Sequence, residues 1–163
     1  MELHFCPVCG EKLTLRRHPT DGELAFCARC GDWRWPLFST AVSAAVLSEA
    51  RTHLLLIRQY GEEAPVLPAG YVDKGETAED AVRRELMEEL GMTVRSLRFC
   101  RSRWYAPSET LMLHYVAVVR ETEARPNREV DGWEWVPVGE ALARVAPGGL
   151  AAALLRDSFD NEE

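Results

Sequence analysis

The chain has 163 residues, a formal net charge of −7 and 47% hydrophobic residues. This length suits one medium domain with a small appendage, and the hydrophobic content is sufficient for a core, so the composition excludes an intrinsically disordered chain. No apolar run reaches the roughly 20 residues of a membrane helix, and the start lacks the basic and apolar regions of a signal peptide. We therefore expect a cytoplasmic protein that does not bind membranes.

The negative charge lies beyond residue 36. Residues 1–36 carry equal numbers of basic and acidic side chains, so the rest of the chain carries the whole net charge. The sequence has no basic tract of the kind that would indicate broad nucleic-acid binding. An acidic protein needs cations to bridge it to an anionic phosphate, so a phosphate ligand would imply metal dependence.

Residues 1–36 are rich in cysteine, glycine and turn residues and lack a long apolar periodicity. Two similar knuckles, CPVCG and CARCG, give the spacing C-x2-C-x17-C-x2-C. Such a pair supplies the four thiolates of a tetrahedral Zn²⁺ site, and with every position taken the zinc would be structural. A redox C-x-x-C pair is the alternative, but it explains only one knuckle. We predict a zinc ribbon over residues 1–36 with the ligands Cys6, Cys9, Cys27 and Cys30.

The remaining chain, residues 37–163, has the patterns of a second domain. The predicted elements are strands at 41–47 and 54–58 around a turn, a short apolar segment at 66–72, a helix at 77–90 that Gly91 ends, strands at 94–101 and 111–120 joined by an irregular loop, a polar connection at 121–130, a strand at 133–138, and helices near 138–145 and 149–159. The tail after residue 159 should fray. This order predicts an α+β domain with a mixed sheet packed with helices.

Acidic side chains share one face of the predicted helix at 77–90. A helix turns about 100° per residue, so Glu85, Glu88 and Glu89 lie together beside the apolar core stripe. Like charges at this spacing repel, and a divalent cation with oxygen ligands, Mg²⁺ or Mn²⁺, would neutralise them. A solvated acidic face is the alternative interpretation. The core stripe consists of Val82, Leu86 and Leu90.

Fixed residues around this helix favour the metal site. The segment from Gly70 to Met92 matches G-x5-E-x7-R-E-U-x-E-E-x-G-U, with U aliphatic, at every specified position. This is the Nudix box, so the sequence resembles the Nudix hydrolases. The resemblance implies the Nudix fold, in which a mixed β-sheet is sandwiched between helices, and water attack on a diphosphate phosphorus assisted by Mg²⁺ or Mn²⁺.

The resemblance also implies roles for the box residues. Glu85 and Glu89 would be the main ligands of the catalytic metal, with Glu88 assisting. Glu89 would also be the leading candidate for activating or positioning the water. Arg84 would orient a carboxylate through a charge-assisted hydrogen bond, and Glu76 would brace the loop against the helix.

Outside the box, the sequence is similar to the NADH pyrophosphatase family, in which a zinc ribbon directly precedes a Nudix domain. That family carries S-Q-P-W-P-F-P-x-S followed by Leu-Met, where this chain reads SRWYAPSETLM from Ser102 to Met112. Ser102 and the Leu-Met pair match, and Tyr105 stands where the family has Trp. Because the ribbon begins at Cys6, we expect a protein without the additional N-terminal domain of longer family members.

This closer resemblance implies further site residues. The Ala69 carbonyl and Glu129 would complete the metal site. Tyr71 follows the box glycine, where the family has a ring-stacking aromatic residue. Trp104 or Tyr105 would supply the second face for a base, from the partner protomer of a homodimer. Core packing of these rings is the alternative interpretation.

Four other residues have plainer interpretations. Arg101 and Arg103 would either meet phosphates or be ordinary exposed strand residues, and the second interpretation is favoured. His114 lies in a predicted strand and is expected to be structural. Cys100 also lies in a predicted strand and is expected to be a small buried hydrophobic residue.

The predicted function is metal-dependent hydrolysis of the diphosphate bond of NADH or NAD⁺ to two mononucleotides. One alternative is hydrolysis of ADP-ribose or another nucleoside diphosphate linked to a second group. Another is removal of NAD caps from RNA, which the acidic charge does not favour. A non-catalytic nucleotide-sensing or ribbon-based interaction module is less favoured, because every carboxylate of the box is present.

Overall fold

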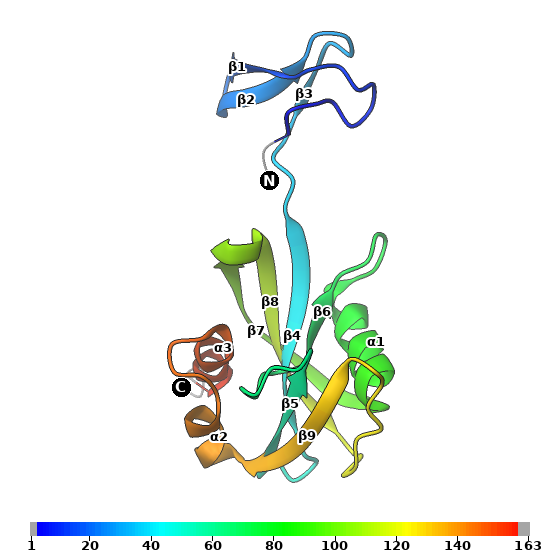
Figure 1. The fold of residues 1–163 in the computed structure, drawn as a ribbon, viewed down its shortest axis with the longest axis vertical. Coiled ribbons are helices and arrows are strands. Elements are labelled where there is room, and N and C mark those ends of the chain that lie inside the picture. Colours follow the sequence, from blue (N-terminus) through cyan, green and yellow to red (C-terminus); the bar gives the residue numbers. More distant parts are fainter. Residues whose placement is uncertain (1–2, 160–163) are drawn as a thin grey trace. The chain divides into compact units, whose positions relative to one another are not determined.

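A computed structural model describes residues 3–159 of the chain (Figure 1). The chain divides into two compact units, Met1–Ser39 and Thr40–Glu163. The expected frayed tail falls on residues 160–163, which lie outside the described residues. Among the described residues, no helix combines the length and apolar character needed to cross a bilayer.

The first unit contains a small antiparallel sheet in the order β1-β2-β3. Its strands are β1 (Thr14–His18), β2 (Gly22–Cys27) and β3 (Asp32–Arg34). The rings of Phe26 and Trp33 pack edge to face with their centroids 5.0 Å apart, and Leu24 on β2 is buried. These strands are too short for the alternation of polar and apolar residues to predict them from the sequence.

The second unit is built on a six-stranded sheet in the order β7-β8-β4-β5-β9, with β6 paired to β4. Its strands are β4 (Ser39–Leu47), β5 (His53–Gln59), β6 (Ala69–Tyr71), β7 (Val94–Tyr105), β8 (Thr110–Val119) and β9 (Val130–Pro137). Its helices are α1 (Ala78–Leu90), the 3-10 turn η1 (Ala106–Ser108), α2 (Val138–Arg144) and α3 (Leu150–Phe159). The predicted α+β architecture, with the sheet between helices, is confirmed.

Helices cover both faces of this sheet: α1 lies on one side, and α2 and α3 lie on the other (Figure 1). Strand β4 shows why its sequence is almost continuously apolar. Val42, Ala44 and Val46 belong to the hydrophobic cluster on the α1 side, whereas Ala45 and Leu47 belong to the cluster on the α3 side. Because successive side chains of a strand point to opposite faces, both sets are buried.

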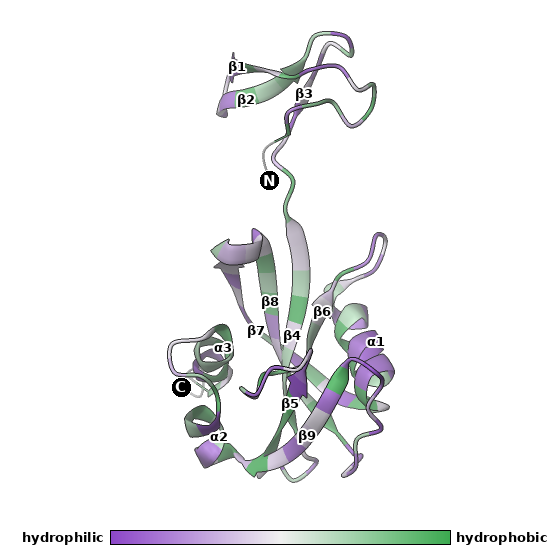
Figure 2. Cartoon of the chain, in the orientation of Figure 1, coloured by the Kyte–Doolittle hydropathy of each residue, from purple (hydrophilic) through white to green (hydrophobic). Residues whose placement is uncertain are grey.

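Helix α1 begins and ends close to the residues that the sequence predicted. The Thr77 hydroxyl caps the helix by accepting a hydrogen bond from the backbone N–H of Asp80 at 3.2 Å. Gly91 ends the helix in the left-handed region at φ 64°, a conformation that glycine adopts without a steric penalty. The buried stripe includes Val82, Leu86 and Leu90. Hydrophilic residues of α1 are visible in Figure 2.

The expected irregular loop between the strands at 94–101 and 111–120 is wrong in its extent. Strand β7 continues to Tyr105, and β8 begins at Thr110, so only the turn η1 separates them. Strand β7 lies at the edge of the sheet, pairs with β8 and has a register irregularity between Phe99 and Arg101. An exposed edge strand tolerates arginines at many positions, which hides the alternation that identifies a strand.

Candidate functional site

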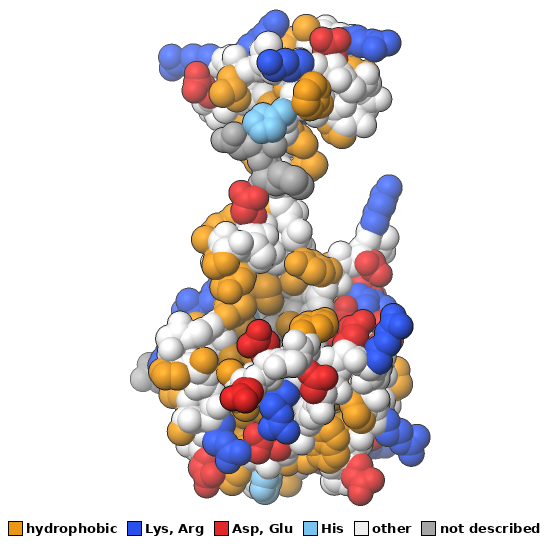
Figure 3. All heavy atoms as spheres, in the orientation of Figure 1, with side chains coloured by type: hydrophobic (Ala, Val, Ile, Leu, Met, Phe, Trp, Pro, Cys, Tyr) orange, Lys and Arg blue, Asp and Glu red, His pale blue; other side chains and the backbone are white. Residues whose placement is uncertain are grey.

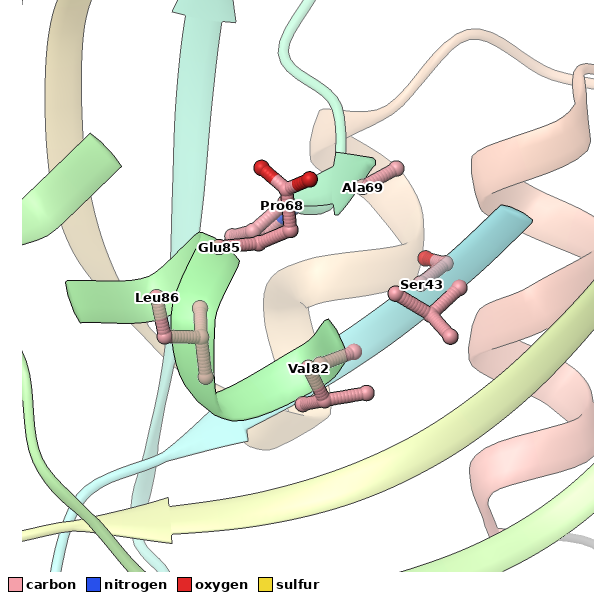
Figure 4. A pocket seen from close by; sticks show the side chains of 8 residues that line it. Ser43, Pro68, Ala69, Val82, Glu85 and Leu86 are labelled. Carbon is pink, nitrogen blue, oxygen red and sulfur yellow. The ribbon is translucent and has the colours of Figure 1, made fainter. Parts of the chain in front are cut away.

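The carboxylates of α1 lie against strand β6, and Gly70 makes this approach possible. A Cβ atom added at Gly70 would lie 2.0 Å from the carboxyl carbon of Glu85, which is far inside van der Waals contact. Strand β6 pairs with β4, with Ala69 opposite Ser43. Figure 4 shows the Glu85 side chain extending toward the Pro68–Ala69 segment. Helix α1 and strand β6 are therefore in contact where the Glu85 carboxylate lies against the backbone of Gly70.

Glu89 is the most buried carboxylate of the helix, with 3% of its surface exposed. Its Oε1 accepts a hydrogen bond from Gln59 Nε2 at 3.3 Å, and its Oε2 has no hydrogen-bond partner among the described residues. Burial and the neighbouring charges of Glu85 and Glu129 raise the pKa of Glu89 to about 7. A buried oxygen without a partner is costly, and a bound cation would satisfy it.

The other two carboxylates of the box helix are in different environments. Burial raises the pKa of Glu85, although Arg84 opposes the shift. The Glu88 side chain is 59% exposed. Glu89 is therefore buried, Glu85 half-buried and Glu88 solvated, and the first two resist ionisation unless a positive charge is nearby.

Arg84 joins the loop, the helix and the carboxylates. Its Nε and Nη2 donate to the two oxygens of Glu76 at 2.9 and 3.0 Å, and Nη1 donates to Glu85 at 2.8 Å and to Glu88 at 3.2 Å. Its Nη2 also donates to the Tyr71 carbonyl at 2.9 Å. Hydrogen bonds from Arg84 lower the pKa of Glu76 and keep it ionised. Arg84 therefore holds Glu85 through its Oε1.

Two further residues lie near the carboxylate cluster. Glu129 lies in the polar connection just before β9 and is exposed, and its charge raises the pKa of Glu89. Tyr60 is 74% exposed, and partial desolvation together with the charges of Glu129, Glu89 and Glu85 raises its pKa. Glu129 and Tyr60 therefore share the electrostatic environment of the box acids. No sequence motif indicated Tyr60.

The aromatic residues expected to bind a base lie in two places. Tyr71 is 58% exposed beside the box loop. Trp104, which is 54% exposed, and Tyr105 line a cavity of about 440 Å³ between the end of β7 and the start of α3. Tyr71 does not line this cavity, so the structure does not bring Tyr71 together with Trp104 and Tyr105 there.

Arg101 and Arg103 are paired with a residue that the sequence analysis did not single out. Arg103 binds both oxygens of Asp157 through Nε and Nη2, the second at 2.7 Å, and Arg101 Nη1 lies 3.5 Å from the same carboxylate. Asp157 is 1% exposed, and hydrogen bonds from Arg103 lower its pKa. Arg101 is an exposed strand residue, as the favoured interpretation held, whereas Arg103 is only half-exposed.

His114 and Cys100 also lie on the α3 side of the sheet. His114 is fully buried, its Nε2 lies 2.8 Å from Ser158 Oγ, and burial lowers its pKa to about 4. It is structural, as expected. Cys100 is only partly buried, so the expectation of a buried residue is correct only in part; it packs against the hydrophobic cluster of α2 and α3.

In the first unit, the four knuckle cysteines come together. Their sulfur atoms all lie within 4.8 Å of one another, with Cys6 and Cys30 at 3.9 Å and Cys9 and Cys27 at 3.5 Å. Tetrahedral zinc with bonds near 2.3 Å places its sulfurs roughly 3.8 Å apart, so the residues fit a metal ion. The fifth cysteine belongs to the other unit.

Neighbouring groups shift the pKa values of two cysteines in this cluster. Burial opposes ionisation of Cys6, but the Val8 backbone N–H and the Arg34 guanidinium lower its pKa to about 6. Arg34 Nε donates to the Cys6 sulfur at 3.2 Å. The sulfurs of Cys9 and Cys27 raise the pKa of Cys30 to about 12. Sulfurs packed this closely ionise together only when a cation neutralises them.

Comparison with known proteins identifies the class of the second unit. The NUDIX domain family matches residues 37–154, and this match includes the box loop, α1 and the sheet. The chain therefore belongs to the Nudix family. The solved Nudix hydrolase from Nitrosomonas europaea superposes with a TM-score of 0.74 at 19% identity, covering 94% of this chain and 89% of that one. The Nudix domain of Shewanella oneidensis NrtR, solved with ADP ribose, gives 0.63 at 15% identity, covering 81% and 90%.

Curated relatives are similar over almost the whole chain. A protein of Photobacterium profundum named NAD-capped RNA hydrolase NudC is 30% identical over 155 residues, which is 94% of this chain and 56% of the relative. The protein of the same name in Haemophilus influenzae is 30% identical over 159 residues, 93% of this chain and 58% of the relative. The chain thus spans well under two thirds of the length of these relatives.

Proposed function

We propose that the chain is a metal-dependent hydrolase that cleaves the diphosphate bond of a dinucleotide, NADH or NAD⁺, to give two mononucleotides. The observation that carries this proposal is the Oε2 of buried Glu89, which has no partner among residues 3–159 and lies beside Glu85. A buried and a half-buried carboxylate are tolerated side by side there when a cation lies between them. The names of the curated relatives support a substrate that contains NAD.

The oxygen donors of these residues suit Mg²⁺ or Mn²⁺ in kind. Glu85 and Glu89 would be the main ligands, and exposed Glu88 would assist. The Ala69 carbonyl on β6 and Glu129 would complete the oxygen set that these ions prefer. When bound, the ion polarises the phosphate and acidifies its water.

The chain's own groups then orient the reaction. Gln59 donates to Glu89 Oε1 and so orients this carboxylate, which would bind the ion and position the attacking water. Arg84 keeps Glu85 in place through Nη1 and secures the loop through Glu76. Exposed Tyr71 would stack on a base, with Trp104 or Tyr105 of a second protomer as the opposite face in a homodimer.

Removal of NAD caps from RNA is the second candidate. The relatives' printed names favour it. On the face seen in Figure 3, basic side chains are interspersed with acidic ones and form no continuous tract, which favours a small substrate. ADP-ribose hydrolysis and nucleotide sensing without catalysis are further alternatives, and retention of every box carboxylate opposes the last.

For the first unit, we propose that Cys6, Cys9, Cys27 and Cys30 hold one structural Zn²⁺. The sulfur separations support this, and four protein ligands leave no position for a reactive water.

A substrate panel tests the catalytic proposal. NADH, NAD⁺, ADP-ribose, diadenosine polyphosphates and NAD-capped RNA are incubated with Mg²⁺, with Mn²⁺ and without added ion, and products are separated by chromatography. We expect NADH or NAD⁺ to give two mononucleotides only when a divalent ion is present. Absence of turnover with every substrate would overturn the proposal, and Glu89→Gln serves as the inactive control.

A further inference from the structure

The turn that follows β5 holds an exposed tyrosine beside the carboxylate cluster. Gln59, whose amide binds Glu89, ends β5, and Tyr60 and Gly61 come directly after it. The Glu62 N–H donates to the Gln59 carbonyl at 3.0 Å and closes the turn. The turn therefore begins at a residue that is in contact with the proposed metal site.

Tyr60 adopts a backbone conformation that its side chain disfavours. Its φ is 56°, and Gly61 follows with a φ of 76°, as in a type I′ turn. Both central positions of such a turn favour glycine or asparagine, because a bulky side chain in the left-handed region clashes with its own backbone. The conformation of Tyr60 therefore costs free energy that the rest of the fold must offset.

Contacts with β9 hold this turn in place. The Gly61 N–H donates to Asp131 Oδ2 at 2.7 Å, and Gln59 pairs with Val130. Glu129, which is proposed as a metal ligand, directly precedes β9. Tyr60 is thus fixed to the same segment of chain that positions Glu129.

Packing does not explain a tyrosine at this position. Tyr60 is 74% exposed, so its ring buries little apolar surface. An asparagine would adopt the same backbone conformation with less strain and would lose little packing. Strained residues gather at functional sites, and here the strained residue lies beside one. The side chain of Tyr60 therefore points to a role in the site and not in the fold.

The phenol hydroxyl lies in the electrostatic field of the box acids. Partial desolvation and the charges of Glu129, Glu89 and Glu85 raise the pKa of Tyr60, so the hydroxyl keeps its proton. A protonated phenol is a hydrogen-bond donor that carries no charge. Beside carboxylates that would hold a cation, the natural acceptor for this donor is the anion that the cation attracts, which is a phosphate.

We propose that the Tyr60 hydroxyl donates a hydrogen bond to a phosphate oxygen of the diphosphate and so acts as a substrate-binding residue. The inference rests on the proposed function in taking a diphosphate as the ligand. The hydroxyl transfers no proton in this role. Its loss should therefore weaken the binding of substrate and leave the turnover of bound substrate nearly unchanged.

Binding without turnover tests the proposal. The full zinc-loaded chain with Mg²⁺ is titrated by calorimetry with methylenebisphosphonate and with an NAD⁺ analogue in which CH₂ replaces the bridging oxygen. Tyr60→Phe removes the hydroxyl alone and should weaken both ligands about tenfold, as the loss of one hydrogen bond to a charged group predicts. Tyr115→Phe is the matched control, because its hydroxyl donates to Glu79 at 3.0 Å, outside the proposed site.

A second variant separates strain from binding. Tyr60→Asn relieves the strained turn, so it should raise the urea concentration at the midpoint of unfolding while weakening both ligands at least as much as Tyr60→Phe does. Arg51→Asn is the control for strain, because Arg51 has a φ of 57° between β4 and β5. It should gain stability with unchanged binding of both ligands.

Each outcome decides the proposal. Binding of both ligands by Tyr60→Phe within about twofold of the unchanged protein overturns it. A loss confined to the NAD⁺ analogue, or no binding of methylenebisphosphonate by the unchanged protein, also overturns it, because the contact would then lie outside the diphosphate. Mn²⁺ alone should bind Tyr60→Phe and the unchanged protein equally, and weaker Mn²⁺ binding by the variant would mean that Tyr60 acts on the metal site instead.

Hydrolysis of NADH with Mg²⁺ is measured separately on the unchanged protein. Its absence would contradict the proposed function and leave the comparison of methylenebisphosphonate binding intact. Where hydrolysis is found, Tyr60→Phe should raise KM about tenfold and keep kcat within about twofold.

Discussion

The α hydrogens of Gly70 face the carboxylate of Glu85 so closely that a methyl group at Gly70 would lie 2.0 Å from its carboxyl carbon and Oε1. The glycine of the box is therefore required for space at this point and not for an unusual backbone angle, since Gly70 is not among the positive-φ residues. The position of a metal ligand depends on the absence of a side chain on the neighbouring strand.

Gly70→Ala should therefore move Glu85 and weaken the metal site. We expect hydrolysis to fall by about 10- to 100-fold, with a higher Mn²⁺ concentration needed for half-maximal rate. Steady-state kinetics against Mn²⁺ concentration measures this. Gly139→Ala is the matched control, because a Cβ at Gly139 in α2 meets nothing within 4 Å. Unchanged metal dependence in Gly70→Ala would contradict the assignment of Glu85.

Glu89→Gln should abolish activity and stabilise the metal-free protein. Burial and the Glu85 and Glu129 charges raise the pKa of Glu89 from 4.5 to about 7. The folded protein thus holds the proton more tightly than the unfolded chain, and stability falls as pH rises from 4.5 to 7. At pH 8 without metal, removing this charge should raise the free energy of unfolding by about 1–3 kcal/mol.

Urea unfolding at pH 5 and pH 8 measures the stability effect, and the rate of hydrolysis should fall at least about 100-fold. Glu88→Gln is the control, because exposed Glu88 should change stability by less than about 0.5 kcal/mol. A Glu89→Gln protein that hydrolyses substrate at the original rate contradicts the proposed role, whatever its stability.

Removal of zinc should unfold the first unit. That unit has few buried side chains and a three-stranded sheet, so metal binding supplies much of its folding free energy. Metal analysis should find about one zinc per chain, and Cys6→Ser should lower this content. In the NMR spectrum of Cys6→Ser, the chemical shifts of Phe26 and Trp33 should move toward those of an unfolded chain. Cys100→Ser should retain the metal. Full zinc content in Cys6→Ser would remove Cys6 from the ligand set.

His114 should make the protein less stable in mild acid. Burial lowers its pKa from 6.5 to about 4, against the opposing charge of Asp157. Below pH 6.5 this histidine becomes protonated in the unfolded chain, but in the folded protein it stays neutral until about pH 4. Stability is therefore lost as pH falls through this window, by at most about 3 kcal/mol.

The difference in unfolding free energy between the unchanged protein and His114→Gln isolates this effect from the carboxylates, whose contribution both proteins share. That difference should vary between pH 6.5 and 4 and be constant above. His53→Gln, at an exposed histidine, should follow the unchanged protein. A pH-independent difference would mean that His114 does not remain neutral in the fold.

Features encoded by short spacings were predictable from the sequence. The two cysteine knuckles, the cap at Thr77, the stop at Gly91 and the acidic face of α1 each depend on residues a few positions apart, and the structure has all of them. Their physical causes, ligand geometry and helix periodicity, act locally.

Partners that lie far apart in the chain were not predictable. Asp157 is 54 residues from Arg103, and Gln59 is 30 residues from Glu89. Each contact depends on how α3 packs on the sheet or how β5 meets α1, which no single pattern in the sequence encodes. The extent of β7 was missed because arginines occupy an edge strand that packing constrains weakly.

Strand β7 has a consequence for self-association. An edge strand exposes unpaired backbone groups that could recruit the same strand of another copy, and long edges of this kind seed aggregates. Here the edge carries Arg95, Arg98, Arg101 and Arg103. Two such edges placed side by side would oppose arginine to arginine, so the strand that carries Trp104 and Tyr105 also protects the sheet from extending into a fibre.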